Sequence, residues 1–226
     1  MTQTLKIDVY VELICPWCLI GKSNLESALA QLAETDPDLH VQVQWHTVQL
    51  VPEVPSEGWP FAEFYLRRLG SPEAVRQRQA QVRAAAAQAG VEIDFARIER
   101  FPNTTLAHRL LAFAEHQPSV VDAMLDRLFE AYFQRGENIG DVRTLLDIAQ
   151  ELGLDREAAA ACSTPSRHGR PSLLQSRGFR CSYSTNNFPC QAPSHPRCWC
   201  RPSGTAYRSA RRLDASFEDA EVRVGG

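Results

Sequence analysis

The chain has 226 residues, of which 44% are hydrophobic and 23% are charged, a composition typical of an ordinary soluble domain. It contains no run of about 20 apolar residues, so we expect no transmembrane helix. The first eight residues lack a cationic segment followed by an apolar one. We therefore expect no secretory signal and a cytoplasmic location.

Charge is distributed unevenly along the chain. Residues 1–160 hold 14 Lys and Arg against 23 Asp and Glu, whereas residues 161–226 hold 10 against 4. No acidic residue occurs between Glu157 and Asp214. The character of the sequence therefore changes near residue 160, although the net charge of the whole chain is only −3.

The N-terminal residues alternate between apolar and polar side chains. This period of two runs from Leu5 to Glu12 and again from Val41 to His46, and it predicts two strands. Between them, apolar residues recur at helical spacing from Leu25 to Leu32. With the Cys15 and Cys18 pair between the first strand and this helix, the order strand, CxxC, helix, strand is the opening of a thioredoxin-like α/β domain.

The motif Cys15-Pro16-Trp17-Cys18 lies where the first strand passes into this helix. Two cysteines at this spacing can close a disulfide, and the unpaired N–H groups at a helix start stabilise a thiolate on the first of them. A thiolate beside a second thiol performs dithiol–disulfide exchange. Half of a zinc site and an inert thiol pair are the alternatives, and zinc would need a second ligand pair at suitable spacing.

A Pro-rich connection over residues 51–60 is followed by an expected all-helical block of four or five helices over residues 58–153. Ser71 and Pro72 are a strong helix start, and Gly90 is the matching stop. Apolar residues at helical spacing predict three further helices, around residues 106–113, around residues 120–132, and from a capping Asp141 to Gly153.

A thioredoxin motif whose second strand is followed by inserted helices resembles the DsbA family. Residues 14–22 are similar to its cytoplasmic FrnE-like branch, and the resemblance covers roughly residues 5–160. Three further stretches carry it, namely residues 101–110, 131–133 and 138–141. The implied fold class is α/β, a thioredoxin-like fold with a helical insertion after the second strand. The expected parts are a thioredoxin half (1–54), a helical insertion (55–157) and an aberrant or disordered tail (158–226).

The resemblance implies a dithiol–disulfide oxidoreductase acting on thiols or disulfides of proteins or small molecules. Cys15 would be the exposed nucleophile and Cys18 the more buried resolving thiol, with Pro16 and Trp17 setting the redox poise. From its place three residues before Cys15, Glu12 is a candidate proton acceptor for Cys18, or else it caps a loop. We expect no metal or nucleotide cofactor, glutathione as an optional co-substrate, no nucleic-acid or membrane partner, and a monomer or homodimer.

The tail departs from the family pattern. Residues 162–212 hold 9 Ser, 9 Arg and 5 of the 7 cysteines, where the family has a cis-proline strand, a hairpin and a last helix. Three explanations compete: a disordered basic tail, a metal module, and a reading frame that slipped near residues 158–166. The shifted frame permits the string G-V-P-x-F-x-F-N, which resembles the missing cis-proline strand. The metal module, in contrast, would use Cys181, Cys190, Cys198 and Cys200 as ligands. Without the cis-proline segment, we expect impaired activity.

Two other functions stay open. One is a glutathione-dependent isomerase or transferase of the kappa-like group, whose members carry serine at the position of Cys15. The other is a non-catalytic redox-sensing module. Among the remaining polar residues, we interpret His46 as a surface or hydrogen-bonded histidine and His108 with Arg109 as part of a solvated helix face. We assign the aromatic residues Trp45, Phe61, Phe64 and Tyr65 to core packing.

Overall fold

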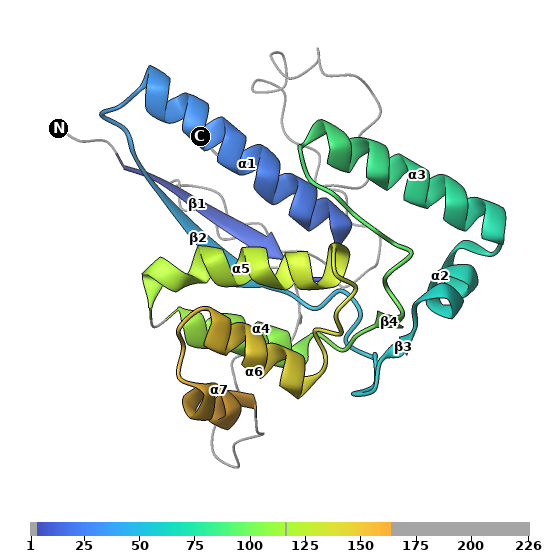
Figure 1. The fold of residues 1–226 in the computed structure, drawn as a ribbon. Coiled ribbons are helices and arrows are strands. Elements are labelled where there is room, and N and C mark those ends of the chain that lie inside the picture. Colours follow the sequence, from blue (N-terminus) through green and yellow to red (C-terminus); the bar gives the residue numbers. More distant parts are fainter. Residues whose placement is uncertain (1–3, 116, 164–226) are drawn as a thin grey trace, which may run out of the picture. The chain divides into compact units, whose positions relative to one another are not determined.

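A computed structural model describes residues 4–115 and 117–163, and it has an α/β architecture (Figure 1). The expectations for the tail (disorder, a four-cysteine metal module, a shifted frame) lie mainly on residues 164–226, outside the described residues. In chain order, the elements are β1 (Thr4–Val11), α1 (Pro16–Thr35), β2 (His40–Thr47), β3 (Trp59–Pro60), α2 (Phe61–Leu69), α3 (Pro72–Gln88), β4 (Arg100–Phe101), α4 (Thr105–Ala114), α5 (Pro118–Phe133), α6 (Val142–Glu151) and α7 (Arg156–Ser163).

Strands β1 and β2 pair in parallel, and α1 is the crossover that a parallel pair requires. Both strands begin within one residue of the predicted positions. In the register, Val9 lies opposite Trp45 and Tyr10 lies opposite His46. Because side chains alternate along a strand, the apolar residues of both strands share one face and the polar residues share the other.

The polar face of this sheet carries a small cluster of three residues. His46 Nε2 lies 2.7 Å from Asp8 Oδ1, and the His46 ring stacks on Tyr10 with ring centroids 4.9 Å apart. The structure thus confirms the interpretation of His46 as a hydrogen-bonded histidine. It lies on the sheet face opposite Val9 and Trp45.

The residues after β2 form five helices, α2 to α6, as the sequence predicts, but the block is not all-helical. The two-residue strands β3 and β4 pair antiparallel, with Trp59 opposite Phe101. Strands this short produce no alternation that a sequence pattern could reveal. Helix α7 is also additional, and it runs across residue 157, so residues beyond that position continue to pack on α4 and α6.

The helix signals act mostly as predicted. Ser71 is the N-cap of α3, where its side chain accepts a hydrogen bond from the N–H of Ala74 at 3.1 Å. Gly90 follows the end of α3 with φ +73°, a left-handed conformation that glycine adopts without strain. Asp141 occupies the N-cap position of α6, as predicted. Its side chain, however, makes no capping hydrogen bond.

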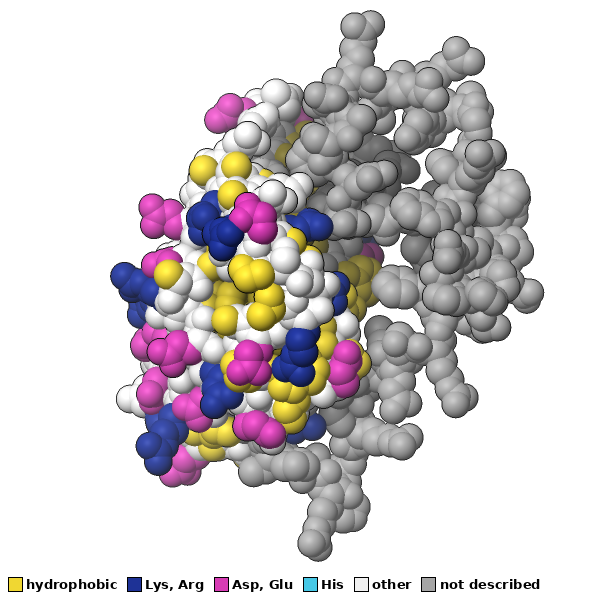
Figure 2. All heavy atoms as spheres, turned by 90° about the vertical axis from the view of Figure 1, so that its right-hand side faces the viewer, with side chains coloured by type: hydrophobic (Ala, Val, Ile, Leu, Met, Phe, Trp, Pro, Cys, Tyr) yellow, Lys and Arg dark blue, Asp and Glu magenta, His cyan; other side chains and the backbone are white. Residues whose placement is uncertain are grey.

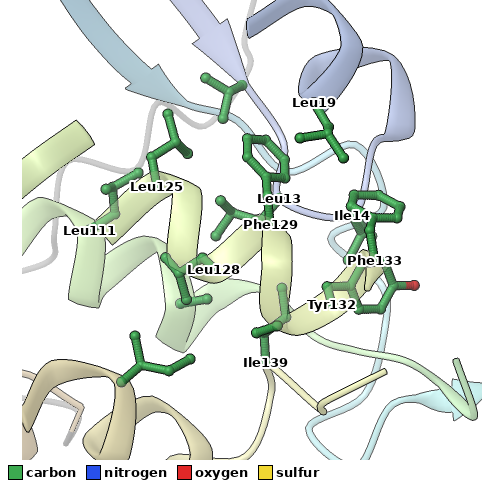
Figure 3. Close-up of a cluster of buried hydrophobic side chains, with 14 of the residues drawn as sticks. Leu13, Ile14, Leu19, Leu111, Leu125, Leu128, Phe129, Tyr132, Phe133 and Ile139 are labelled. Carbon is green, nitrogen blue, oxygen red and sulfur yellow. The ribbon is translucent and has the colours of Figure 1, made fainter. Parts of the chain in front are cut away.

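The hydrophobic core encloses the segment that leads into α1. Figure 3 shows side chains of this segment lying against the C-terminal half of α5. Leu13 is fully buried, and Ile14 and Leu19 are nearly so. Because these residues flank both cysteines, the packing of α5 fixes the start of α1. Their labelled neighbours on α5 in Figure 3 are Phe129, Tyr132 and Phe133.

Polar contacts also join α1 and β2 to α5. Lys22 is a buried lysine whose Nζ lies 2.5 Å from Asp126 Oδ1 and also bonds to Glu26. Burial lowers the pKa of Lys22, and the two carboxylates raise it by more, so it ends above its usual value. The indole N–H of Trp45 donates to Asp122 Oδ1 at 2.7 Å.

The face of the molecule drawn in Figure 2 carries Lys and Arg side chains interspersed with Asp and Glu around scattered hydrophobic side chains. Over the residues that the structure describes, no helix combines the length and apolarity needed to cross a bilayer.

Candidate active site

Cys15 is the N-cap residue of α1. Its backbone is extended (φ −90°, ψ 112°), and its carbonyl accepts the first helical bonds from the N–H groups of Cys18 and Leu19, at 3.0 and 3.4 Å. Pro16 occupies the first helical position, where a missing N–H costs nothing and the fixed φ suits the helix. The sequence therefore places the first thiol at the positive end of the helix dipole.

The thiol of Cys15 is acidic. A hydrogen bond from the Cys18 thiol lowers the pKa of Cys15 from 9.0 to about 7, and the N–H groups of Cys18 and Trp17 act in the same direction. Burial and the charge of Glu12 oppose them. The Cys15 side chain makes no capping hydrogen bond. We therefore attribute the effect of these N–H groups on the pKa of Cys15 to their dipoles.

The thiol of Cys18 is correspondingly weak as an acid. Its hydrogen bond to Cys15 raises the pKa of Cys18 far above its usual value, and burial and the charge of Cys15 add to this. Its sulfur accepts a hydrogen bond from the N–H of Glu12 at 3.5 Å. Both thiols are free and half-buried, so the structure does not show the difference in exposure that the family resemblance implies.

Glu12 is buried at the end of β1, with 1% of its surface exposed. Its Oε1 accepts from the N–H of Leu13 at 2.8 Å, and Oε2 accepts from the N–H of Leu50 at 3.0 Å. The hydroxyl of Thr104 and the ring Nε2 of His108 lie at 3.4 and 3.0 Å from Oε2 and Oε1. Four donors therefore surround a carboxylate that raises the pKa of both cysteines.

The interpretation of His108 as part of a solvated helix face is wrong. This side chain is 2% exposed and faces Glu12 from α4. It shares a side of α4 with Thr104, one turn earlier, and Leu111, one turn later, and both are buried. That spacing was the available signal, but a polar residue on an apolar stripe does not identify its partner.

An aromatic group from α2 interacts with the dithiol. Burial raises the pKa of Tyr65 to about 12, and the charge of Cys15 adds to this, which places the phenol near the first thiol. The rings of Phe61 and Tyr65 are tilted with centroids 4.7 Å apart, and Phe64 stacks on Phe101 with centroids 3.8 Å apart. The assignment of Phe61, Phe64 and Tyr65 to packing is confirmed, although Tyr65 also interacts with Cys15.

Other residues singled out in the sequence lie on α1 and β2. Trp17 is half-buried and packs against the core, while Pro16 begins α1. Trp45 lies on β2 and bonds to α5. Within residues 4–115 and 117–163, no group of three or more His, Cys, Asp or Glu side chains is arranged to hold a metal ion.

An acidic thiol at a helix start, a second thiol one turn later and a preceding parallel strand together define the dithiol class of thioredoxin-fold proteins. The sequence profile of the DSBA-like thioredoxin domain matches residues 6–169, and the chain belongs to that family. This confirms both the thioredoxin-like α/β fold and the DsbA-family resemblance. Membership of the FrnE-like branch stays a prediction.

The chain is similar to several known proteins. YwbO of Bacillus subtilis (strain 168) is 30% identical over 153 residues, which are 68% of each chain. A structure described as a probable DsbA oxidoreductase from Streptomyces coelicolor is 26% identical with a TM-score of 0.62, over 70% of this chain and 66% of that one. A 2-hydroxychromene-2-carboxylate isomerase is 15% identical with a TM-score of 0.50, over 72% of each chain, a likeness of fold alone.

Proposed function

We propose that the chain is a dithiol–disulfide oxidoreductase that uses Cys15 as the nucleophile and Cys18 as the resolving thiol. The observation that carries the proposal is the opposite perturbation of the two thiols: the pKa of Cys15 falls to about 7, while that of Cys18 rises. A thiol with a pKa near the ambient pH is both ionised and nucleophilic, and it is therefore the attacking group. The DSBA-like family match supports this chemistry.

The exchange proceeds in two balanced steps. The Cys15 thiolate attacks a substrate disulfide, one substrate sulfur leaves as a thiolate, and a mixed disulfide forms. Cys18 then attacks Cys15 Sγ, the second substrate sulfur leaves as a thiolate, and the Cys15–Cys18 disulfide closes. The two electrons pass to the substrate, so reduction of another disulfide and oxidation of a dithiol are the two directions of one reaction.

The second step requires Cys18 to lose a proton, and Glu12 is the base that we propose for it. The N–H of Glu12 contacts the Cys18 sulfur, and the carboxylate interacts electrostatically with both thiols. Thr104 supports this role because its hydroxyl can turn from donor to acceptor once the carboxylate is protonated. Pro16 and Trp17 modulate the site by starting α1 and directing the amide of residue 17 toward Cys15.

We further propose that the substrates are proteins or small molecules that carry thiols or disulfides, with glutathione as an optional co-substrate. The chain would act as a monomer or homodimer in the cytoplasm, without a metal or nucleotide cofactor and without nucleic-acid or membrane partners. Mass measurement in solution and cell fractionation test the oligomeric state and the location. Turnover assays with insulin and with glutathione disulfide separate protein substrates from small ones.

The proposed function is tested with two matched cysteine variants. Cys15→Ser should abolish insulin-disulfide reduction, because no nucleophile remains. Cys18→Ser should instead accumulate a mixed disulfide that mass spectrometry detects, because the captured substrate is no longer released. Equal activity of Cys15→Ser and the unmodified chain would refute the proposal. A glutathione-dependent isomerase activity that survives in Cys15→Ser would favour the kappa-like alternative.

A further inference from the structure

A buried histidine from the helical block touches the carboxylate behind the dithiol. His108 Nε2 lies 3.0 Å from Glu12 Oε1, although the two residues are 96 positions apart in the chain. Both side chains are at least 98% buried. Since an ionised carboxylate only accepts hydrogen bonds, this contact requires a proton on Nε2. The other ring nitrogen, Nδ1, has no hydrogen-bond partner among the described residues.

His108 differs from the other three donors to Glu12 in one property. The N–H groups of Leu13 and Leu50 and the hydroxyl of Thr104 are neutral at every accessible pH. The imidazole alone can take a positive charge, because Nδ1 is free to bind a second proton. With a neutral ring, Glu12 and His108 together carry one negative charge; with a protonated ring, they carry none.

Titratable groups face this pair from α1 and α5, whereas the charged residues of α5 bond elsewhere: Asp122 to Trp45, Asp126 to Lys22, Arg127 to Glu137 and Glu130 to Arg135. Cys15 and Cys18 interact electrostatically with Glu12 from the start of α1, and Tyr132 does so from α5. The phenol of Tyr132 is fully buried, and burial raises its pKa well above the usual value, so it stays neutral. The charged residues of α6 and α7, the other helices that pack on α4, have exposed side chains: Arg143, Asp147, Glu151, Arg156 and Glu157.

We propose that His108 is a positioning residue of the exchange reaction: it orients the Glu12 carboxylate toward the dithiol, and its protonation sets the net charge that the dithiol faces. The inference rests on the proposed function, since it assigns a role within the same site. A protonated His108 cancels the charge of Glu12 and makes the Cys15 thiolate easier to form. A neutral His108 restores the charge and makes Glu12 a stronger acceptor for the proton of Cys18.

The test is the pH dependence of Cys15 alkylation by iodoacetamide in the reduced full-length chain. Under the proposal, the positive charge on His108 is lost when its ring releases the second proton and no longer favours ionisation of Cys15, so the alkylation curve of the unmodified protein should be broader than a one-proton curve. His108→Gln keeps an N–H donor for Glu12 but cannot be charged, and its curve should be an ordinary one-proton titration. At the acidic end of the curve, where the proposal gives the ring of the unmodified chain its second proton, it should react about 3- to 10-fold more slowly than the unmodified chain, the effect of one nearby charge.

Two further variants separate this role from a structural one. Glu12→Gln removes the charge that His108 would balance, so adding His108→Gln in that background should change the alkylation curve by less than about 2-fold. His46→Gln is the matched control, because that histidine pairs with Asp8 on the polar sheet face. It should leave the broad curve of the unmodified chain unchanged.

Three outcomes would overturn the proposal. The first is a His108→Gln curve with the same shape as that of the unmodified chain, merely shifted, which is what a structural role predicts. The second is an undiminished effect in the Glu12→Gln background. The third outcome decides the case in which His108→Gln does not fold, as judged by circular dichroism. It is a one-proton alkylation curve in the unmodified chain. Alkylation needs no turnover, so loss of exchange activity alone would refute the proposed function and leave this inference standing.

Discussion

The acidity of Cys15 is a property of one residue and its immediate neighbours. Its thiolate accepts a hydrogen bond from the Cys18 thiol and faces the amides of Trp17 and Cys18. The unfolded chain offers none of these contacts, so its Cys15 should titrate near the ordinary value of 9.0. The folded reduced protein thus releases this proton at lower pH than the unfolded chain does, which links stability to pH.

The first prediction at this scale is that the reduced chain gains stability between pH 7 and pH 9, relative to Cys15→Ser. The sign follows from proton binding: in this window the unfolded chain holds a proton on Cys15 that the folded chain has released, so stability rises with pH. The gain is complete near pH 9 and is lost as pH falls through about 7. Urea unfolding of both proteins at the two pH values measures it, and parallel behaviour of the two would contradict it.

The sequence was sufficient to place Cys15, Cys18 and Glu12, because the end of a strand and the start of a helix are local signals. It did not reveal that His108 meets Glu12. That contact depends on how α4 packs against the end of β1, and no local pattern encodes it. Burial of a polar residue is detected only once its partner is known.

At the scale of elements, residues that favour a helix start and a helix end made both ends of α3 predictable. Ser71 and Pro72 define its start, and Gly90 lies just beyond its end. The pair β3–β4 was not predictable, because two residues cannot show alternation. Helix α7 has an N-cap residue in Asp155, whose carboxylate accepts from the N–H of Ala158 at 2.7 Å, but it lies where the composition of the chain changes.

One glycine holds a loop against the end of α5. Gly136 has φ +69°, and a Cβ built there would lie 2.2 Å from the carbonyl oxygen of Arg97. Backbone rather than a flexible side chain is in the way, so the loop has to move. The N–H of Asp94 also donates to the carbonyl of Phe133 at 2.8 Å, which anchors this loop to the same end of α5.

We therefore predict that Gly136→Ala destabilises the fold by roughly 2 kcal/mol or more, through left-handed strain plus a backbone clash. Gly153→Ala is the matched control. It has φ +76° but no atom within 4 Å of the added Cβ, so it should cost only about 1 kcal/mol. Chemical denaturation measures both, and equal costs would show that the close approach to Arg97 contributes nothing.

For the molecule as a whole, the decisive contacts join the strand–helix–strand unit to α4 and α5. Hydrophobic side chains pack there, as Figure 3 shows for Leu13 and Phe129. Lys22 with Asp126 and Trp45 with Asp122 add polar contacts. The order of the elements and the family could be predicted from the sequence, whereas these pairings between distant segments could not, since each depends on three-dimensional packing.

Asp126→Ala tests the contribution of this interface to stability. It leaves the Lys22 ammonium, with only 2% of its side chain exposed, paired to Glu26 alone, so the free energy of unfolding should fall by about 1–2 kcal/mol. Asp147→Ala is the control, because its pair with Arg156 is exposed on both sides and should contribute less than about 1 kcal/mol. Thermal melts compare the two variants, and a smaller effect for Asp126→Ala would contradict the prediction.

The distance in sequence between Glu12 and His108 also has a consequence during synthesis. The ribosome delivers Cys15 and Cys18 long before α4, and the 96 positions between Glu12 and His108 take roughly 5–20 s at about 5–20 residues per second. Throughout that interval the nascent chain carries two cysteines without the carboxylate–imidazole pair behind them. The chemistry of the motif is therefore completed only when the later helices emerge and dock.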